Sequence, residues 1–159
     1  MIKLVAFDVD GVLTDGSITY DENGVEYKTF NAKDGQGIVR LNNAGIVTAI
    51  ITARNNGTVT KRAQDLSIKE LHQGQKNKIA KLDELLEQYH LTYAEVAYIG
   101  DDLPDMEILS KVKIAGCPND AVDEIINIAN WRAKKNGGRG AVLLCLAWKT
   151  DTGESLPGD

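Results

Sequence analysis

Aspartates crowd together directly after an apolar run near the start of the chain. The segment FDVDGVLTDG, residues 7–16, puts Asp8 and Asp10 on either side of Val9. In an extended chain both side chains leave on the same face, because alternate residues share a face. Two ionised carboxylates this close repel each other, and a shared proton or a bound cation relieves the repulsion. The spacing therefore indicates a site that holds a proton or a cation.

A second acidic group follows another apolar run, residues 96–99, in the segment YIGDDLPDME. If the two runs are neighbouring parallel strands, their carboxyl ends converge and up to five carboxylates share one crevice: Asp8, Asp10, Asp101, Asp102 and Asp105. Several carboxylate ligands suit a hard divalent cation, and magnesium takes a few carboxylates together with phosphate oxygens and water. Aspartates also serve in turns and helix caps, but two clusters at corresponding strand ends favour a site for magnesium and phosphate.

Carboxylate, hydroxyl and amine groups in this arrangement suit phosphoryl transfer. A carboxylate beside magnesium can attack phosphorus and form an aspartyl phosphate, which divides hydrolysis into two easier steps. A second carboxyl group can protonate the leaving oxygen and then activate water. The phosphoryl group also requires fixed donors, and the candidates are Thr52 in IITAR and Lys78 in GQKNK. Taken singly, such a threonine is more often structural and such a lysine more often solvated.

Apolar runs alternate with amphipathic stretches along the chain. This alternation predicts an α/β fold, a Rossmann-like doubly wound parallel sheet with helices on both faces and ligands at the carboxyl ends of the strands. Apolar residues recur every three or four positions across residues 76–89, which predicts a helix with one apolar face. The expected strands are residues 4–7, 46–51, 68–71, 96–99 and 113–115, with a weaker one at 131–133.

One segment departs from this alternation. SITYDENGVEYKTF, residues 17–30, has two alternating runs around Asn23-Gly24, a strong signal for a tight β-hairpin. Because the segment follows the first acidic cluster immediately, we expect the hairpin to stand over that cluster as a flap.

The whole sequence is that of one globular domain. A chain of 159 residues, 43% hydrophobic and 26% charged, is long enough for a single core, and we expect a domain at 1–149 and a polar tail at 150–159. No apolar stretch approaches the roughly 20 residues that span a bilayer, and the first residues lack a signal-peptide pattern. We therefore expect a cytoplasmic location and no membrane partner.

Charge and cysteine content exclude further classes. A net charge of −5 without a cluster of basic residues argues against nucleic acid as a partner. Cys117 and Cys145 have neither the spacing of a metal knuckle nor the number of a disulfide framework. We expect both to be buried free thiols.

Four pieces in this order resemble the haloacid dehalogenase superfamily of phosphohydrolases: DVDG, the threonine of ITAR, the lysine of GQKNK, and GDDLPD. The resemblance implies that Asp8 is the nucleophile and Asp10 the general acid and base. It also implies that Thr52 binds the phosphate and that Lys78 balances charge at the phosphoryl group.

The same resemblance implies a magnesium site and an open crevice. Magnesium would be held by the Asp8 carboxylate, the Asp10 backbone carbonyl and Asp101, with Asp102 in support. Members of this superfamily usually carry a cap domain after the first or second motif. Here the first gap holds only the hairpin and one helix, and the second only one helix and one strand, so the chain resembles a capless member. Such a site stays open to water unless a macromolecular substrate or another subunit covers it.

Further segments resemble the capless 3-deoxy-D-manno-octulosonate (KDO) 8-phosphate phosphatases: FNAKDGQGI at 30–38, QGQKNK at 73–78 and GGRGA at 137–141. These are homotetramers in which a neighbouring subunit helps to close the site. The resemblance implies a sugar acid phosphate substrate, KDO 8-phosphate first, and a role in lipopolysaccharide biosynthesis. The substrate carboxylate suits a bidentate guanidinium, and Arg54, Arg62 and Arg139 are the candidates, some of them across a subunit interface.

Three alternatives stay open at this point. Relatives commonly have Arg at the position of Lys33 and Gly at the position of Ala53, beside the expected sugar site, so a nine-carbon keto sugar acid 9-phosphate is an alternative substrate. A receiver module phosphorylated on aspartate would be a switch without turnover. Asp10 argues against it, because a general acid and base there speeds loss of the phosphoryl group. A non-catalytic interaction module would keep the fold, but the retention of all four motifs argues against that reading.

Overall fold

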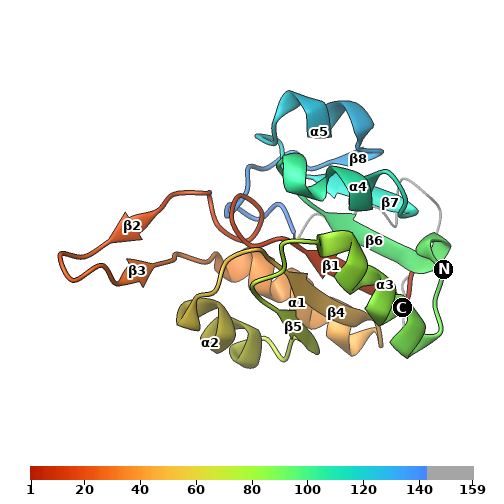
Figure 1. The fold of residues 1–159 in the computed structure, drawn as a ribbon, viewed down its shortest axis with the longest axis horizontal. Helices are drawn as coiled ribbons and strands as arrows, with labels where there is room; N and C mark the ends of the chain where they lie inside the picture. Colours follow the sequence, from red (N-terminus) through yellow and green to blue (C-terminus); the bar gives the residue numbers. More distant parts are fainter. Residues whose placement is uncertain (143–159) are drawn as a thin grey trace.

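A six-stranded parallel sheet forms the centre of the computed structural model, which describes residues 1–142 (Figure 1). Its strands are β1 (Leu4–Phe7), β4 (Val47–Ile51), β5 (Glu70–His72), β6 (Val96–Ile99), β7 (Ile114–Cys117) and β8 (Trp131–Arg132). The spatial order is β5-β4-β1-β6-β7-β8, and every neighbouring pair is parallel. The chain runs from β1 to one edge and then returns to build the other, so the strand order reverses beside β1. Ligands of such sheets bind at this reversal.

Helices cover both faces of the sheet. They are α1 (Ala32–Asn43), α2 (Gly57–Asp65), α3 (Lys78–Tyr89), α4 (Met106–Leu109) and α5 (Asp123–Ile128), with short 3-10 turns η1 (Tyr93–Glu95) and η2 (Leu103–Asp105). Val5 and Phe7 of β1 lie in one buried apolar cluster with residues of α1 and α2. Leu4 and Ala6 lie in a second cluster with residues of α3, α4 and α5. Alternate residues of β1 thus enter opposite cores, which confirms the predicted doubly wound α/β fold.

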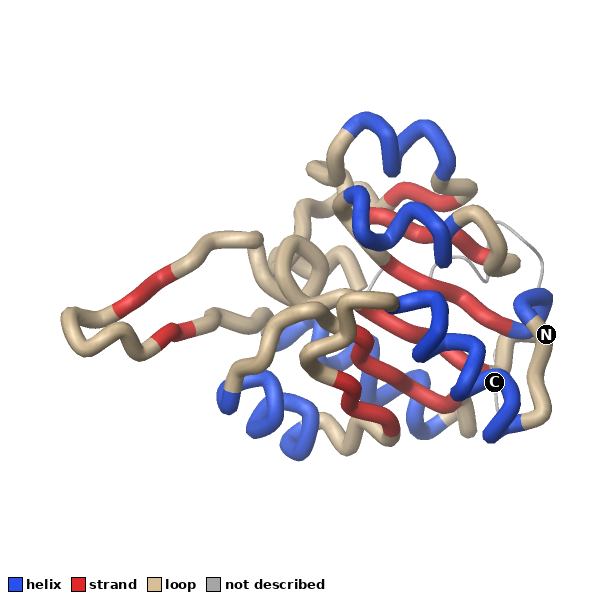
Figure 2. Tube along the Cα trace, in the orientation of Figure 1, coloured by secondary structure: helices blue, strands red, loops and turns tan. Residues whose placement is uncertain are grey.

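An antiparallel hairpin leaves the body between β1 and α1. Its strands are β2 (Thr19–Tyr20) and β3 (Glu26–Tyr27). Residues 21–25 connect the two strands, the Asp21 N–H donates to the Val25 carbonyl within this connection, and Gly24 adopts the left-handed conformation at φ +78°. The predicted hairpin is therefore confirmed. Its strands pair only with each other, and Figure 2 shows the tip projecting away from the body, so the base of the hairpin is the part that reaches the acidic cluster.

Several elements begin or end a few residues from their predicted limits. β5 begins at Glu70, later than predicted, because the Ile68 N–H instead closes the end of α2 on the Ala63 carbonyl. β7 extends to Cys117, beyond the predicted end at 115. α3 begins at Lys78, because the preceding asparagine caps the helix through its side chain.

The described residues bear on some of the remaining expectations. Cys117 is a buried free thiol, as predicted. Within the part of the chain that the structure describes, no helix is long and apolar enough to cross a membrane. Cys145, the domain limit at 149 and the tail at 150–159 lie outside the described residues.

Candidate active site

The three central strands end at one crevice, which has a volume of about 290 Å³. Asp8 directly follows β1, Thr52 directly follows β4, and Asp101 lies just beyond β6. Every residue predicted for catalysis or metal binding lines this crevice: Asp8, Asp10, Thr52, Lys78 and Asp101. Arg54 and Asp102 line it as well. The convergence of strand ends expected from the sequence is therefore present.

Three carboxylates lie close together at the site. Carboxylate oxygens of Asp8, Asp101 and Asp105 lie within 4.8 Å of one another. Burial and the charge of Asp105 raise the pKa of Asp8 to about 6. Burial and the charges of Asp8 and Asp105 raise the pKa of Asp101 to about 8. Both carboxyl groups thus hold protons more tightly than usual, which is the expected result of crowding acids without a cation.

Lys78 supplies one positive charge to this cluster. Its Nζ lies 3.1 Å from Asp8 Oδ2 and 2.8 Å from Asp105 Oδ1. Burial opposes the charged form of the amine, but the two carboxylates outweigh it and raise the pKa of Lys78. Lys78 therefore stays protonated, and it sits at the first position of α3, where the helix holds its backbone.

The donor set fits a divalent cation. When the three carboxylates are ionised, their charge of −3 is met by +1 from Lys78, and −2 remains. Asp101 Oδ1 is buried and has no hydrogen-bond partner among the described residues. An unpaired buried carboxylate oxygen is costly unless a cation or a proton binds it. An all-oxygen set of this kind suits a hard cation such as magnesium.

Asp105 organises the site, a role that the sequence did not reveal. Its carboxylate accepts hydrogen bonds from Lys78, from the Tyr98 hydroxyl at 2.6 Å, and from the backbone N–H of Asp101 at 3.1 Å and of Asp102 at 3.4 Å. The carboxylate thereby fixes both the lysine and the loop that carries Asp101. Tyr98 was also missed, and the available signal was a hydroxyl-bearing residue inside an otherwise aliphatic strand.

Glycines bring the loop after β1 close to its neighbours. Gly11 has φ +83°, and a Cβ there would lie 1.9 Å from Asp101 Oδ2. A Cβ at Gly137 would lie 1.8 Å from the Gly11 carbonyl oxygen. The loop is therefore packed between the acidic loop after β6 and the glycine-rich segment 137–141, which leaves no room for a side chain at either glycine.

Asp10 faces the hairpin rather than the three carboxylates. Lys28 Nζ lies 2.5 Å from Asp10 Oδ1 and 3.3 Å from Glu26 Oε1. Arg54 NH2 lies 2.8 Å from the same Glu26 oxygen. The base of the hairpin thus contacts two crevice residues, and neither Lys28 nor Glu26 was predicted, because alternating charged residues in a strand usually face solvent.

Thr52 and Asp102 complete the rim. The Thr52 N–H donates to the His72 carbonyl and its own carbonyl accepts from the Gln75 N–H, so the backbone of this buried residue is held on both sides. Asp102 accepts from the Leu103 N–H at 2.7 Å and starts η2. It lines the crevice but lies outside the three-carboxylate cluster.

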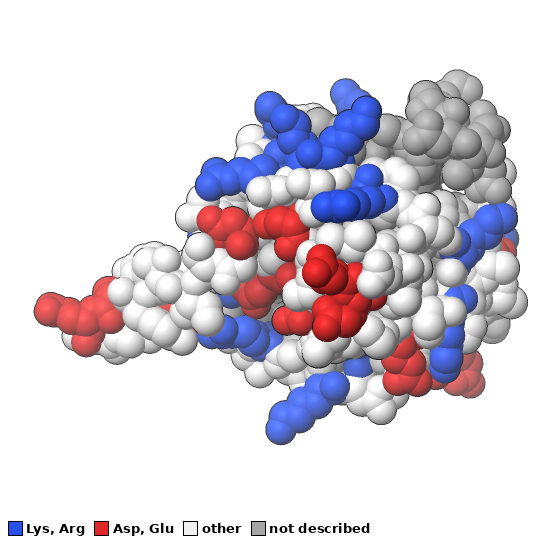
Figure 3. Space-filling view, turned by 90° about the horizontal axis from the view of Figure 1, so that it is seen from above, with Lys and Arg blue, Asp and Glu red and all other residues white. Residues whose placement is uncertain are grey.

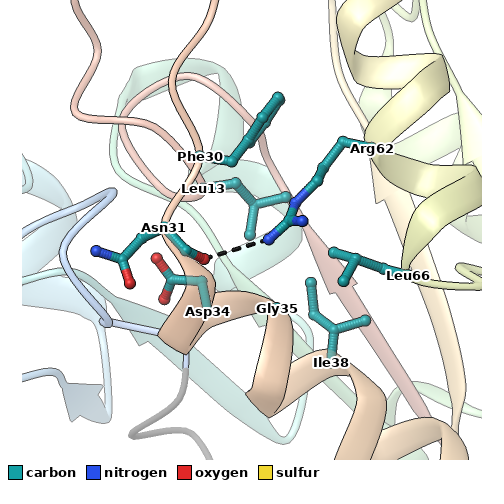
Figure 4. A pocket seen from close by; sticks show the side chains of 8 residues that line it. All are labelled: Leu13, Phe30, Asn31, Asp34, Gly35, Ile38, Arg62 and Leu66. Atoms are coloured by element: carbon teal, nitrogen blue, oxygen red, sulfur yellow. Dashed lines mark hydrogen bonds between the residues drawn. The ribbon is translucent and has the colours of Figure 1, made fainter.

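Two of the three predicted arginines lie outside the lining of this crevice. Arg62 reaches from α2 to the Phe30 ring, 5.8 Å from its centroid, and donates to the Asn31 carbonyl at 3.3 Å. Figure 4 shows it in a separate apolar pocket against α1. Arg139 is exposed, 3.9 Å from Asp15. Within one chain, Arg54 is the predicted arginine that lines the crevice.

Comparison with known proteins places this fold and site in a class. The family model described as haloacid dehalogenase-like hydrolase matches residues 67–145. The crystal structure of the KDO 8-phosphate phosphatase of Moraxella catarrhalis, in complex with magnesium, phosphate and KDO, superposes with a TM-score of 0.90 at 37% identity, covering 94% of this chain and 86% of that one. The cobalt-bound phosphatase of Haemophilus influenzae superposes with a TM-score of 0.86 at 33% identity, covering 97% and 94%. The chain has the doubly wound fold of a haloacid dehalogenase-like hydrolase.

Relatives found by sequence show which family within this class the chain belongs to. The KDO 8-phosphate phosphatase KdsC of Escherichia coli K12 is 43% identical over 151 residues, which cover 92% of this chain and 80% of the relative. The KdsC protein of Yersinia pestis is 40% identical over 141 residues, 89% of this chain and 75% of the relative. The chain belongs to the 3-deoxy-D-manno-octulosonate 8-phosphate phosphatase family, which confirms the resemblance seen in its motifs.

Proposed function

We propose that this chain is a magnesium-dependent phosphatase that hydrolyses KDO 8-phosphate to KDO and phosphate through an aspartyl phosphate. The observation that carries the proposal is the contact of Asp8 with Lys78 beside Asp101, at the carboxyl ends of the central strands. Family membership adds the substrate class, since the Escherichia coli relative and the Moraxella catarrhalis structure are phosphatases of KDO 8-phosphate.

Magnesium would be held by the carboxylates of Asp8 and Asp101 and the backbone carbonyl of Asp10. Bound there, it would neutralise the crowded carboxylates and the phosphoryl oxygens. The unpaired Asp101 oxygen and the raised pKa values of Asp8 and Asp101 support this placement. Asp102 would support the loop that carries Asp101.

The residues of the chain divide the reaction into two steps. A carboxylate oxygen of Asp8 bonds to phosphorus while the ester P–O bond breaks, and Asp10 gives its proton to the leaving oxygen. Asp10 then takes a proton from water, the water oxygen bonds to phosphorus, and the bond between Asp8 and phosphorus breaks. Thr52 would bind a phosphoryl oxygen, and Lys78 would balance its charge.

Substrate choice would depend on arginines and on a second subunit. Arg54 is the candidate for the substrate carboxylate within one chain, because it lines the crevice. Arg62 and Arg139 would serve only across a subunit interface. A nine-carbon keto sugar acid 9-phosphate remains the alternative substrate.

The hairpin supports a homotetramer. It exposes four large apolar side chains outside the core, Ile18 at 55%, Tyr20 at 58%, Val25 at 50% and Tyr27 at 53%. Figure 3 shows few charges on the hairpin between its acidic tip and the body. A short isolated hairpin is marginal in water unless it packs against something, so we infer that hairpins from several subunits pack together. The cytoplasmic location and the role in lipopolysaccharide biosynthesis remain predictions.

Phosphate release from a panel of sugar phosphates, with and without magnesium, tests the proposal. The panel includes KDO 8-phosphate and the nine-carbon keto acid 9-phosphate. We expect turnover that requires magnesium and prefers the eight-carbon substrate. Preference for the nine-carbon substrate would change the substrate but keep the chemistry. Absence of turnover in folded, magnesium-bound protein would instead favour a phospho-aspartate switch or an interaction module.

A further inference from the structure

Lys28 occupies an unusual position for a lysine of a projecting hairpin. Its side chain is only 1% exposed, although the hairpin strand beside it is largely open to solvent. Lysine is almost never fully buried unless its amine is paired. Here the amine lies between two carboxylates, Asp10 at 2.5 Å and Glu26 at 3.3 Å. The burial of this charge therefore depends on the contact with a crevice residue.

Asp10 has few other means of holding its side chain. It follows the strand by three residues, and the next residue, Gly11, is in the left-handed conformation. Among residues 1–142, Lys28 is the side chain that makes a hydrogen bond to the Asp10 carboxylate. A charge-assisted bond of this length restricts the rotation of the carboxylate more than a contact with water would.

The contact belongs to a longer chain of ion pairs. Glu26 receives both Lys28 and Arg54, and its own side chain is 13% exposed. Lys28 and Arg54 lower the pKa of Glu26 against the opposing effect of burial. Glu26 therefore stays ionised and gives Lys28 a second carboxylate partner besides Asp10. Glu26 of β3 and Lys28, which follows that strand, thereby hold Asp10 and Arg54 at one edge of the crevice.

We propose that Lys28 is a positioning residue for Asp10, which rests on the proposed function of Asp10 as general acid and base. Lys28 holds one carboxylate oxygen of Asp10 so that the carboxyl proton is delivered to the ester oxygen as the P–O bond breaks. An acid placed in this way contributes only when the leaving group needs a proton.

Two substrates separate this role from a general structural one. KDO 8-phosphate releases an alkoxide that needs protonation, whereas p-nitrophenyl phosphate releases a stable anion. Leaving-group release is measured for both with magnesium in single-turnover experiments, with protein in excess, which isolates the first step. We expect Lys28→Met to slow release from KDO 8-phosphate roughly 10- to 100-fold, part of the 10²–10⁴ that a general acid contributes, and release from p-nitrophenyl phosphate less than about threefold.

Matched variants sharpen the test. Lys28→Arg keeps the charge and should recover part of the lost rate. Asp10→Asn should show the same substrate selectivity, and adding Lys28→Met to it should cause little further loss, because the two residues act as one unit. Lys81→Met removes another partly buried lysine with a carboxylate partner, Glu84, outside the crevice lining, and should leave both rates unchanged.

The possible outcomes distinguish a failure of the role proposed for Lys28 from a failure of the proposed phosphatase function. An equal loss on both substrates, no loss on either, or additive losses in the double variant would overturn the role of Lys28 and leave the phosphatase assignment intact. Because the comparison is a ratio of rates within one protein preparation, partial misfolding of a variant would not mimic the expected selectivity. Wild-type protein that hydrolyses neither substrate with magnesium would overturn the proposed function itself, and the positioning role with it.

Discussion

At the scale of single residues, the main feature of the site is that Asp8, Asp101 and Asp105 lie close together. Their proximity disfavours ionisation of all three carboxyl groups at once. The pKa of Asp8 is about 6 and that of Asp101 about 8, each raised first by burial and then by neighbouring acids. At these two carboxyl groups the folded protein without metal therefore binds more protons than the unfolded chain between about pH 4 and about pH 8. Their contribution to stability should fall as the pH rises through this window.

This excess of protons predicts how magnesium stabilises the fold. A bound divalent cation replaces the protons, so the rise in melting temperature on adding magnesium should be larger at pH 8.5 than at pH 5.5, by at least about 3 °C, roughly 1 kcal/mol for a domain of this size. Thermal unfolding with and without magnesium measures it. Asp101→Asn should remove most of the difference. A rise in melting temperature that is independent of pH would contradict the raised pKa values.

In the proposed mechanism, Asp8 is the nucleophile. Asp8→Asn keeps the size of the side chain but removes the nucleophilic oxygen, so we expect hydrolysis to fall by at least about 10³-fold. The fold should persist, since an amide of the same shape still accepts the contact from Lys78. Steady-state phosphate release and thermal unfolding check the two parts. Ordinary turnover by this variant would exclude Asp8 as the nucleophile.

Gly11 predicts a steric effect on the metal site. Gly11→Ala would place a methyl group 1.9 Å from Asp101 Oδ2 and impose a left-handed conformation on alanine. The Asp101 side chain must move, so magnesium affinity should fall by at least about tenfold, with a loss of unfolding free energy of roughly 1–2 kcal/mol. Calorimetric titration with magnesium measures the affinity. Gly45→Ala, also at a positive φ but with open space around it, is the control for backbone strain alone.

Three of the residues that the sequence predicted share one property. Asp8, Thr52 and Asp101 lie just past strand ends, and the alternation of strands and helices is enough to bring such ends together. Lys28 was not predicted, because its role depends on where the hairpin turns back, which is a matter of tertiary packing. The sequence indicates Asp105 only as one more carboxylate, because its buried bond to Lys78 joins residues 27 positions apart and depends on tertiary packing.

At the scale of elements, α1 is tied to the glycine-rich segment near the end of the described chain. Asp34 in the first turn of α1 is buried and accepts hydrogen bonds from the N–H of Gly140 at 3.2 Å and of Val142 at 2.8 Å. The same segment packs on the loop after β1 through Gly137. One carboxylate therefore joins the beginning of a helix to a segment that supports the site.

This junction predicts a large loss of stability in Asp34→Ala. Two buried N–H groups would lose their acceptor, at about 1–3 kcal/mol each, so we expect the free energy of unfolding to fall by about 2–4 kcal/mol. Chemical denaturation measures the change. Asp65→Ala removes only an exposed pair with Lys61 on α2 and should change stability by less than about 0.5 kcal/mol. Equal effects of the two substitutions would contradict the structural role of Asp34.

The sequence was a better guide to the presence of elements than to their limits. The hairpin was predicted from Asn23-Gly24, yet its direction away from the body could not be, because turn chemistry fixes only the local chain reversal. The predicted strand ends at residue 115, whereas β7 continues to Cys117. The glycine and cysteine that continue it resemble the start of a loop.

At the scale of the whole molecule, the open crevice and the apolar hairpin both bear on the proposed assembly of subunits. A capless site must be shielded from water by something other than its own chain, and the exposed side chains of the hairpin provide a surface on which subunits can assemble. Since Lys28 lies at the base of this hairpin, the proposed assembly and the proposed placement of Asp10 would depend on one element.

The proposed tetramer predicts the effect of charge on the hairpin. Tyr20→Glu combined with Val25→Glu would bury carboxylates in the subunit interface, so the molar mass in solution should fall to that of a smaller species. Size-exclusion chromatography with light scattering measures it. Glu22→Gln, at the tip of the same hairpin, should leave the assembly unchanged. A wild-type protein that is monomeric throughout would contradict the tetramer.

The measurement that tests the central claim most directly is the location of the phosphoryl group during turnover. Wild-type protein and Asp10→Asn, which slows the second step, are mixed with magnesium and p-nitrophenyl phosphate, quenched in acid and analysed by peptide mass spectrometry. We predict one phosphoryl group on the peptide that contains Asp8, more abundant in the variant and absent without magnesium. Release of p-nitrophenol with that peptide unmodified in both proteins would contradict an aspartyl phosphate at Asp8.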